Sequence, residues 1–535
     1  MTASRKRPAL RHWRGAAGLA GAACVIFTVA GCGGSAGSTA SAANGATKSA
    51  AAPSAGPLVW AVNADVTGMD PQNNGQDVSQ NIMSLVYQHL VTLGDGTHIS
   101  PQLAASYKEV SPTVYVFTLR TDVKFSNGRT MTADDVVGSF NRILSKSEAS
   151  YLAGRLSAIK SVKATGADTV EFTLSQPDAG FLQALADPAA AILPMKELNA
   201  GSFNPDKEML GTGPYVVASH QQGNSWSFTK NPYYWQPGLP KISTVQITIL
   251  PDQTTQIAAL RGGSADIATF SSSEAASLTS SIPGMKVVTQ TGTEYYALLL
   301  NDVSSPQLKN VKVRQAINLA ISRAQVASVG LGGNGVPVGP APGLPDSCPV
   351  SSLPYSTQDI AKAKQLLASA GGVSKPLTLQ YDTTFPDMAN IAQVTKTELA
   401  AIGLQVNLQP LPDAQDIKDL VAGDFDLGMT FYGSGTDVYF GLTDWSPTLS
   451  GFTSKFNAPV AAIEASLPLV ASETGAARTQ AISKACTAAD ADSAQIPLDS
   501  KNLTIAWNTS KLSANVLGAE NASDPLRDIA TYSMG

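Results

Sequence analysis

The chain has 535 residues, of which 43% are hydrophobic and 14% are charged, and its formal net charge is −5 at pH 7. That length and apolar content suffice for about two to four domains with large buried cores, which excludes a disordered chain. The acidic balance argues against nucleic-acid partners, because binding to phosphates requires clustered Lys and Arg.

The first 31 residues are organised like an export signal. Their basic residues come early, an apolar stretch runs from Ala16 to Val29, and no acidic residue is present. The stretch is too short for a convincing membrane span. The sequence at 29–32 resembles the lipobox of bacterial lipoproteins, which predicts removal of residues 1–31 and a lipid on Cys32. An ordinary signal peptide that happens to contain cysteine is the alternative.

Residues 32–57 are mostly Gly, Ala and Ser, the composition of a flexible tether. A lipid anchor followed by a tether predicts a folded part held at the outer face of the cytoplasmic membrane. Cys348 and Cys486 are the cysteines of that folded part. An exported pair can form a disulfide, and two independent thiols are the alternative.

The run from 100 to 144 predicts a strand, a turn and a helix in succession. Hydrophobic residues alternate along 114–119, the pattern of a strand with one buried face. The Asn-Gly pair at 127–128 favours the positive φ angles of a hairpin-type turn. Thr132, three residues before Asp135, predicts a capping box at the start of the helix.

This run resembles the extracellular solute-binding proteins of family 5, the receptors of oligopeptide, dipeptide and nickel ABC importers. The matching positions are Pro101, Leu103, Ala104, Ser106, Phe117, Leu119, Arg120, Val123, Phe125, Gly128, Thr132, Ala133, Asp135 and Val136. Tyr107 stands where the family usually has tryptophan and keeps an aromatic residue there. Further landmarks follow in family order, so the resemblance extends over nearly the whole mature chain.

Residues 377–381, 387–401 and 404–408 predict a strand, a helix and a strand, which form a βαβ unit. The resemblance implies an α/β fold of the type II periplasmic-binding-protein class, with two α/β lobes that close about a hinge and an extra domain. It assigns lobe I to 58–97, 167–277 and 497–535, the extra domain to 98–166 and lobe II to 278–496.

Two stretches of the sequence match the residue spacing of enzyme motifs but lack the neighbouring secondary structure that those motifs require. Residues 33–37 match G-x-S-x-G but lie in the tether, and residues 330–335 match G-x-G-x-x-G without opening a helix. The histidines that follow the signal, His89, His98 and His220, are too widely spaced for a histidine-built metal site. We therefore expect no catalytic residue, no cofactor and no metal.

The resemblance also implies a ligand anchor shortly after a strand of lobe II. Peptide-binding members place an aspartate there, which forms a charge-assisted contact with the α-ammonium group of the ligand. Asp437 follows the strand at 425–427 and is the candidate, with a turn-capping loop residue as the alternative. Tyr432, Tyr439 and Trp445 are candidates for lining the cleft, although aromatic residues are more often part of a core.

Together these features predict a lipid-anchored, monomeric receptor that captures a small solute and passes it to an ABC permease and ATPase. A peptide is the first candidate for this solute. A sugar, an opine-like compound or a metal chelate is the alternative ligand. A secreted hydrolase and a sensing receptor without transport are the alternative classes of protein.

Overall fold

The computed structural model describes residues 56–93, 98–145, 150, 152–270, 273–344, 346–433, 437–450, 452–512 and 526–534. The export signal, Cys32 and nearly all of the tether lie outside these ranges, so the predictions made for them stay predictions. Within these ranges, no helix is both long enough and apolar enough to cross a membrane.

The largest sheet in the described part of the chain has eleven strands. Ten of them follow the order β15-β14-β16-β12-β17-β11-β1-β10-β9-β8, and β13 pairs with β17. The strands are β1 Leu58–Val62, β8 Tyr215–Gln221, β9 Ser225–Lys230, β10 Thr244–Ile249, β11 Ile267–Phe270, β12 Met285–Leu300, β13 Gly335–Pro337, β14 Leu377–Asp382, β15 Val406–Leu411, β16 Leu427–Gly433 and β17 Gln495–Asn508.

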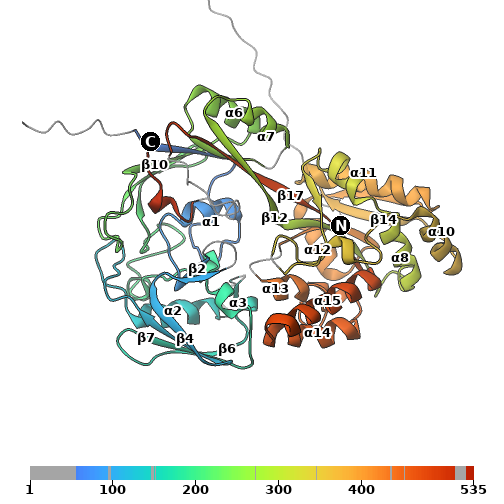
Figure 1. The fold of residues 1–535 in the computed structure, drawn as a ribbon, viewed down its shortest axis with the longest axis horizontal. Helices are drawn as coiled ribbons and strands as arrows, with labels where there is room; N and C mark the ends of the chain where they lie inside the picture. Colours follow the sequence, from blue (N-terminus) through green and yellow to red (C-terminus); the bar gives the residue numbers. More distant parts are fainter. Residues whose placement is uncertain are drawn as a thin grey trace, which may run out of the picture. The chain divides into compact units, whose positions relative to one another are not determined.

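Two long antiparallel strands, β12 and β17, lie side by side in the middle of this sheet (Figure 1). Their pairing runs from Met285 opposite Asn508 to Leu299 opposite Gln495. β12 also pairs with β16, and β17 also pairs with β11. Strands β14 to β16 therefore belong to lobe II and strands β1 and β8 to β11 to lobe I, with β12 and β17 crossing between the lobes.

The register of β12 against β17 shifts between Thr291 and Tyr295. Gly292 lies in this irregular stretch, and a Cβ placed on it would lie 2.9 Å from the carbonyl oxygen of Lys501. The hydroxyl of Ser500 donates a hydrogen bond to the carbonyl oxygen of Gly292 over 2.7 Å. The glycine thus lets the two backbones approach closely where the strands cross between the lobes.

Both faces of the sheet are covered in lobe II. Along β12, Tyr296, Leu298 and Leu300 contribute to one hydrophobic core, and the alternating residues of 295–299 contribute to another. This alternation is the period of two that a strand imposes on its side chains. The first core includes helices α8 Val311–Ala320, α10 Ile360–Ser369 and α11 Pro386–Ala401, and the second includes α13 Val438–Thr443, α14 Ala461–Ser472 and α15 Gly475–Asp492.

The predicted βαβ unit is confirmed. β14 and β15 pair in parallel over their whole length, and α11 connects them. The other elements are β2 Val91–Leu93, β3 Ile99–Pro101, α1 Asp77–Met83, α3 Leu152–Arg155, α4 Phe181–Ala184, α5 Met195–Asn199, α6 Gln253–Gly262, α7 Ser273–Ser280, α9 Arg323–Gln325 and α12 Asp413–Ala422.

The predicted strand, turn and capped helix are also confirmed, in a separate antiparallel sheet. Gly128 adopts a φ of 88°, and Thr132 and Asp135 form the capping box of a helix. The sheet has the order β4-β5-β7-β6 in the described part of the chain. These elements are β4 Ala104–Ser111, β5 Val114–Leu119, β6 Ile159–Ala164, β7 Thr169–Leu174 and α2 Ala133–Ile143.

The small antiparallel sheet continues past residue 166, where the resemblance ends the extra domain. β7 pairs with β5 from Thr169 to Thr173, so the chain stays in this sheet until Leu174. The predicted boundary at 277–278 falls inside α7, and the one at 496–497 falls inside β17. Continuous elements thus cross positions at which the resemblance divides the chain.

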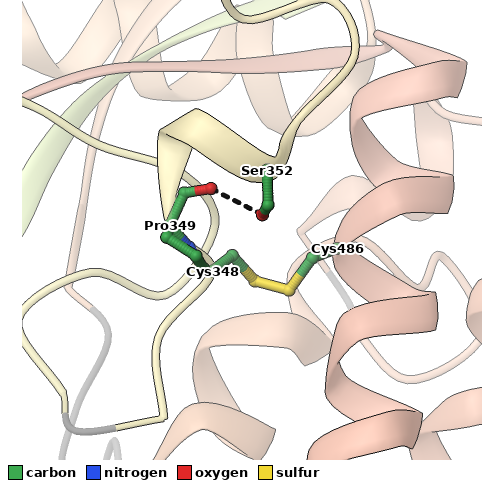
Figure 2. The surroundings of a disulfide bond; sticks show 4 residues. All are labelled: Cys348, Pro349, Ser352 and Cys486. Carbon is green, nitrogen blue, oxygen red and sulfur yellow. Dashed lines mark hydrogen bonds between the residues drawn. A yellow bond between two sulfur atoms is a disulfide. The ribbon is translucent and has the colours of Figure 1, made fainter.

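Cys348 and Cys486 are joined by a disulfide in the structure, with their Cα atoms 5.9 Å apart (Figure 2). Cys486 belongs to α15, and Cys348 precedes Pro349, whose carbonyl oxygen accepts a hydrogen bond from the hydroxyl of Ser352. Both cysteines are buried in the core that contains α13, α14 and α15. The bond links residues 138 positions apart, so it restricts the unfolded chain strongly.

Reduction of this disulfide should lower the free energy of unfolding by about 2–4 kcal/mol, because the reduced unfolded chain gains conformational freedom. We expect a reductant to lower the melting temperature in calorimetry, and expect a C348S/C486S variant not to respond to it. Peptide mapping that finds both thiols free in the unreduced protein would contradict the bond.

Candidate functional site

A cavity of about 330 Å³ lies where the segments before β6 and after β7 face the segment after β16. One wall comes from residues 154–158 and 176–178, and the other from Gly433, residues 439–449 and Ala471. The chemistry of the cavity rests on six of its lining residues, which are Arg155, Asp178, Tyr439, Phe440, Thr443 and Asp444. A volume of this size is at the lower end of the range for small-molecule sites.

The first wall provides one cation and one acid. Arg155, at the end of α3, pairs with Asp187 at 3.0 Å and lies over the ring of Phe440 at 5.6 Å. Asp178 accepts a hydrogen bond from the backbone N–H of Gly180 at 3.0 Å. Burial raises the pKa of Asp178 to about 6, and the negative charge of Asp437 adds to that rise. The carboxyl group of Asp178 is therefore partly protonated near neutral pH.

The second wall provides an acid without a partner. Asp444 is the residue that ends α13, and it is one of the residues that line the cavity. No described residue donates a hydrogen bond to this carboxyl group, and its backbone oxygen accepts one from Gln495. Burial raises the pKa of Asp444 to about 7, against the lowering effect of Arg155. A cationic group that entered the cavity would meet a carboxylate that the protein leaves free.

Asp437, the predicted ammonium anchor, has its carboxylate satisfied inside the protein. One nitrogen of Arg478 contacts both of its oxygens at 2.7 Å. The same carboxylate accepts a hydrogen bond from the backbone N–H of Tyr439 at 2.8 Å, which caps α13. Arg478 is held in turn by the carbonyl oxygen of Val470 at 3.0 Å. These are the contacts of the capping alternative, so Asp444 replaces Asp437 as the candidate anchor.

The predicted aromatic residues separate into two groups. Tyr439 lines the cavity. Tyr432 and Trp445 pack inside lobe II instead, with their rings 5.8 and 6.5 Å from the ring of Tyr295. The hydroxyl of Tyr432 donates to the side-chain oxygen of Gln495, which fixes the ring within the core. Both side chains are buried in the core that α13, α14 and α15 share, Tyr432 from β16 and Trp445 from the segment just after α13.

Phe440 closes the cavity by linking lobe II to the extra domain. Its ring belongs to the hydrophobic core of the extra domain, which also contains Phe172 and Phe181. A Cβ on Gly180 would lie 2.7 Å from this ring, so the glycine makes room for it. Next to this contact, the backbone N–H of Ala179 donates to the carbonyl oxygen of Ala471 at 2.5 Å. The structure is therefore closed at this end of the site.

Removal of the Phe440 ring should loosen this closure. Phe440→Ala loses the burial of an aromatic side chain, worth roughly 2–3 kcal/mol, in a contact that only the closed arrangement makes. We expect faster hydrogen exchange of the Ala179 amide, whose acceptor lies across the interface. Phe452→Ala is the matched control, because that ring packs within lobe II. Equal exchange of Ala179 in wild type and Phe440→Ala would refute the closing role.

A metal centre is not indicated. Within the ranges that the structure describes, no group of three or more His, Cys, Asp or Glu side chains is arranged to hold a metal ion.

Comparisons with known proteins place the chain in a family. The bacterial extracellular solute-binding proteins, family 5 Middle, match residues 98–454. The glutathione-binding protein GsiB of Salmonella typhimurium is 27% identical over 395 residues, which cover 73% of this chain and 76% of that protein. GsiB of Escherichia coli O157:H7 is 27% identical over 410 residues, which cover 75% and 78%.

Solved structures share the fold. The binding protein AgaA of A. tumefaciens R10, in complex with agropinic acid, superimposes with a TM-score of 0.76 at 24% identity, over 90% of this chain and 99% of that chain. The oligopeptide-binding protein AppA of Bacillus subtilis, in complex with a nonapeptide, gives a TM-score of 0.73 at 22% identity, with the same coverage. The chain belongs to the family 5 bacterial extracellular solute-binding proteins.

Proposed function

We propose that this protein captures a small solute that carries a cationic group and delivers it to an ABC permease and ATPase. A peptide with a free amino terminus is the first candidate ligand. The observation that carries the proposal is Asp444, which lines the cavity and whose carboxyl group has no hydrogen-bond donor among the described residues. The relatives that bind glutathione or a nonapeptide support a peptide as the ligand.

The charges of the cavity suit a zwitterionic ligand end. Asp444 and Asp178 offer carboxyl groups to an ammonium, and Arg155 lies on the same wall as Asp178. Charge-assisted hydrogen bonds are about twice as strong as neutral ones, and burial removes competing water. Tyr439 and Phe440 add apolar ring faces that accept different side chains. The protein contributes shape and charge and carries out no reaction.

An opine-like compound is the second candidate ligand. The support for it is Arg155, which lines the cavity and is suited to a carboxylate, together with the relative that binds agropinic acid. A sugar or a metal chelate has no comparable support in the lining residues. Because the chain belongs to a family of solute-binding proteins, we propose a receptor and not a secreted hydrolase.

The cavity variants give the direct test. Asp444→Asn should weaken binding of unblocked tripeptides by roughly ten- to hundredfold in calorimetric titration, because a charge-assisted contact is lost. Asp437→Asn is the matched control, since it should lower the melting temperature by leaving Arg478 without its carboxylate but change affinity little. N-acetylated tripeptides should bind the wild type as weakly as unblocked ones bind Asp444→Asn. The opposite pattern, with affinity lost in Asp437→Asn alone, would falsify the assignment.

Binding should also depend on pH. An ammonium group stabilises ionised Asp444, so the pKa in the complex lies below the value of about 7 in the free protein. Affinity is then highest above pH 7 and falls by up to about tenfold per pH unit as the pH drops below it. Titrations at several pH values test this, and Asp444→Asn should have a flatter profile. An affinity that rises on acidification contradicts an ammonium contact at Asp444.

We also propose that Cys32 carries a lipid that tethers the receptor at the outer face of the membrane, where a monomer meets its permease. The lipobox-like sequence and the tether at 32–57 support it. Cys32→Ala should shift the protein from the membrane fraction to the soluble fraction, whereas Cys24→Ala should leave it membrane-bound. Unchanged membrane association of Cys32→Ala would exclude the anchor.

A further inference from the structure

The cavity that Asp444 lines contains more negative charge than one ligand ammonium can balance. Among its lining residues in the described part of the chain, the charged ones are Arg155, Asp178 and Asp444. The guanidinium group of Arg155 is paired with the buried carboxylate of Asp187 at 3.0 Å. Arg155 keeps further N–H groups for a ligand, but Asp187 balances its charge. Two carboxyl groups of the cavity therefore remain without a counter-charge.

Asp178 is fixed in the first wall with one carboxyl oxygen bonded and the other open. The residue is only 7% exposed. Its Oδ1 atom accepts the hydrogen bond from the backbone N–H of Gly180 at 3.0 Å, which holds the carboxyl group at the turn before α4. No described residue donates a hydrogen bond to its Oδ2 atom, and the protein does not fully enclose that atom. A donor that enters the cavity can therefore reach it.

No cation of the protein compensates for this second acid. In the ranges that the structure describes, neither Asp178 nor Asp444 takes part in an ion pair. Arg478 is committed to Asp437, both of whose carboxylate oxygens it contacts at 2.7 Å. A charge withdrawn from water is costly while it has no partner, and a charge-assisted contact with a cation removes that cost. Asp178 is therefore suited to a second cationic group of the ligand.

The size of the cavity limits how a ligand can supply two cations. Its volume of about 330 Å³ is at the lower end of the range for small-molecule sites. Asp178 lies on the first wall and Asp444 on the second, so both acids face this one small space. Two cationic groups must then come from the same end of a peptide. A first residue with a basic side chain supplies both, and the rings of Tyr439 and Phe440 offer apolar faces to its methylene groups.

We propose that Asp178 selects peptides whose first residue is lysine or arginine, by pairing with the side-chain cation while Asp444 binds the terminal ammonium. This inference rests on the proposed function, because it needs Asp444 as the ammonium anchor of the same cavity. It adds a role for the second acid and a preferred class of ligand, a peptide with two positive charges on its first residue.

Three unblocked peptides separate the side-chain charge from other effects. Lys-Ala-Ala carries the second cation on its first residue, and norleucine-Ala-Ala has a similar side chain without the charge. Ala-Ala-Lys has the composition and net charge of Lys-Ala-Ala, with the cation displaced to the other end. In calorimetric titration of the full chain near pH 7, we expect the wild type to bind Lys-Ala-Ala roughly tenfold or more tightly than the other two. Equal affinity of the wild type for all three would overturn the proposal.

Asp178→Asn tests the residue itself. The amide keeps an oxygen for the N–H of Gly180 but loses the charge, so this variant should lose the preference for Lys-Ala-Ala over norleucine-Ala-Ala. Asp122→Asn is the matched control, because this exposed acid of the extra domain does not line the cavity and its variant should keep the wild-type preference. An Asp178→Asn protein that keeps the wild-type ratio of the two affinities would overturn the role of Asp178, whether or not both affinities fall.

The proposed function and this inference fail in different ways. Asp444→Asn should bind all three peptides weakly, because the contact with the terminal ammonium is lost. If Asp444→Asn weakens binding but Asp178→Asn keeps the wild-type preference, the role of Asp178 is wrong and the proposed function stands. If Asp444→Asn binds all three peptides as the wild type does, the ammonium anchor is wrong, and this inference falls with it.

Discussion

The pairing of β12 with β17 is the constraint on which the rest of the structure depends. These two strands belong to both lobes, so every other strand of the large sheet takes its place relative to them. Their alternating side chains supply both cores of lobe II. The register of the two strands shifts twice, between Thr291 and Tyr295 and between Tyr295 and Ala297, and Gly292 in the first of these stretches lets the backbones approach closely.

The site depends on which buried charges the protein neutralises by itself. Asp437 and Arg478 satisfy each other and cap a helix, so that acid serves the fold. Asp444, at the other end of the same short helix, has no partner in the described part of the chain. A carboxyl group withdrawn from water and left unpaired is costly unless a proton or a ligand neutralises it, so a cationic ligand would stabilise ionised Asp444.

Local structure could be predicted from the sequence because its causes are local. The capping box at Thr132 and the alternation along β5 depend on residues close together in the chain. The continuation of the small sheet past 166 had no local signal, because β7 pairs with β5, more than forty residues earlier in the chain. Tyr432 and Trp445 were misplaced because an aromatic residue has the same sequence pattern in a core and in a cleft.

Other parts of the site had no sequence signal. Arg155 precedes β6 and Asp178 follows β7, and the fold brings both into the cavity that Asp444 lines. The pairing of Asp437 with Arg478 joins residues 41 positions apart, and no motif marks it. The family resemblance pointed to Asp437, whose carboxylate the fold pairs with Arg478.

The most direct measurement is a crystal structure of the wild-type protein with an unblocked tripeptide bound. The account predicts the peptide ammonium within hydrogen-bond distance of Asp444, in the cavity beneath Phe440, with Arg478 still paired to Asp437. An ammonium bound at Asp437 with Arg478 displaced, or a peptide bound away from this cavity, would contradict it.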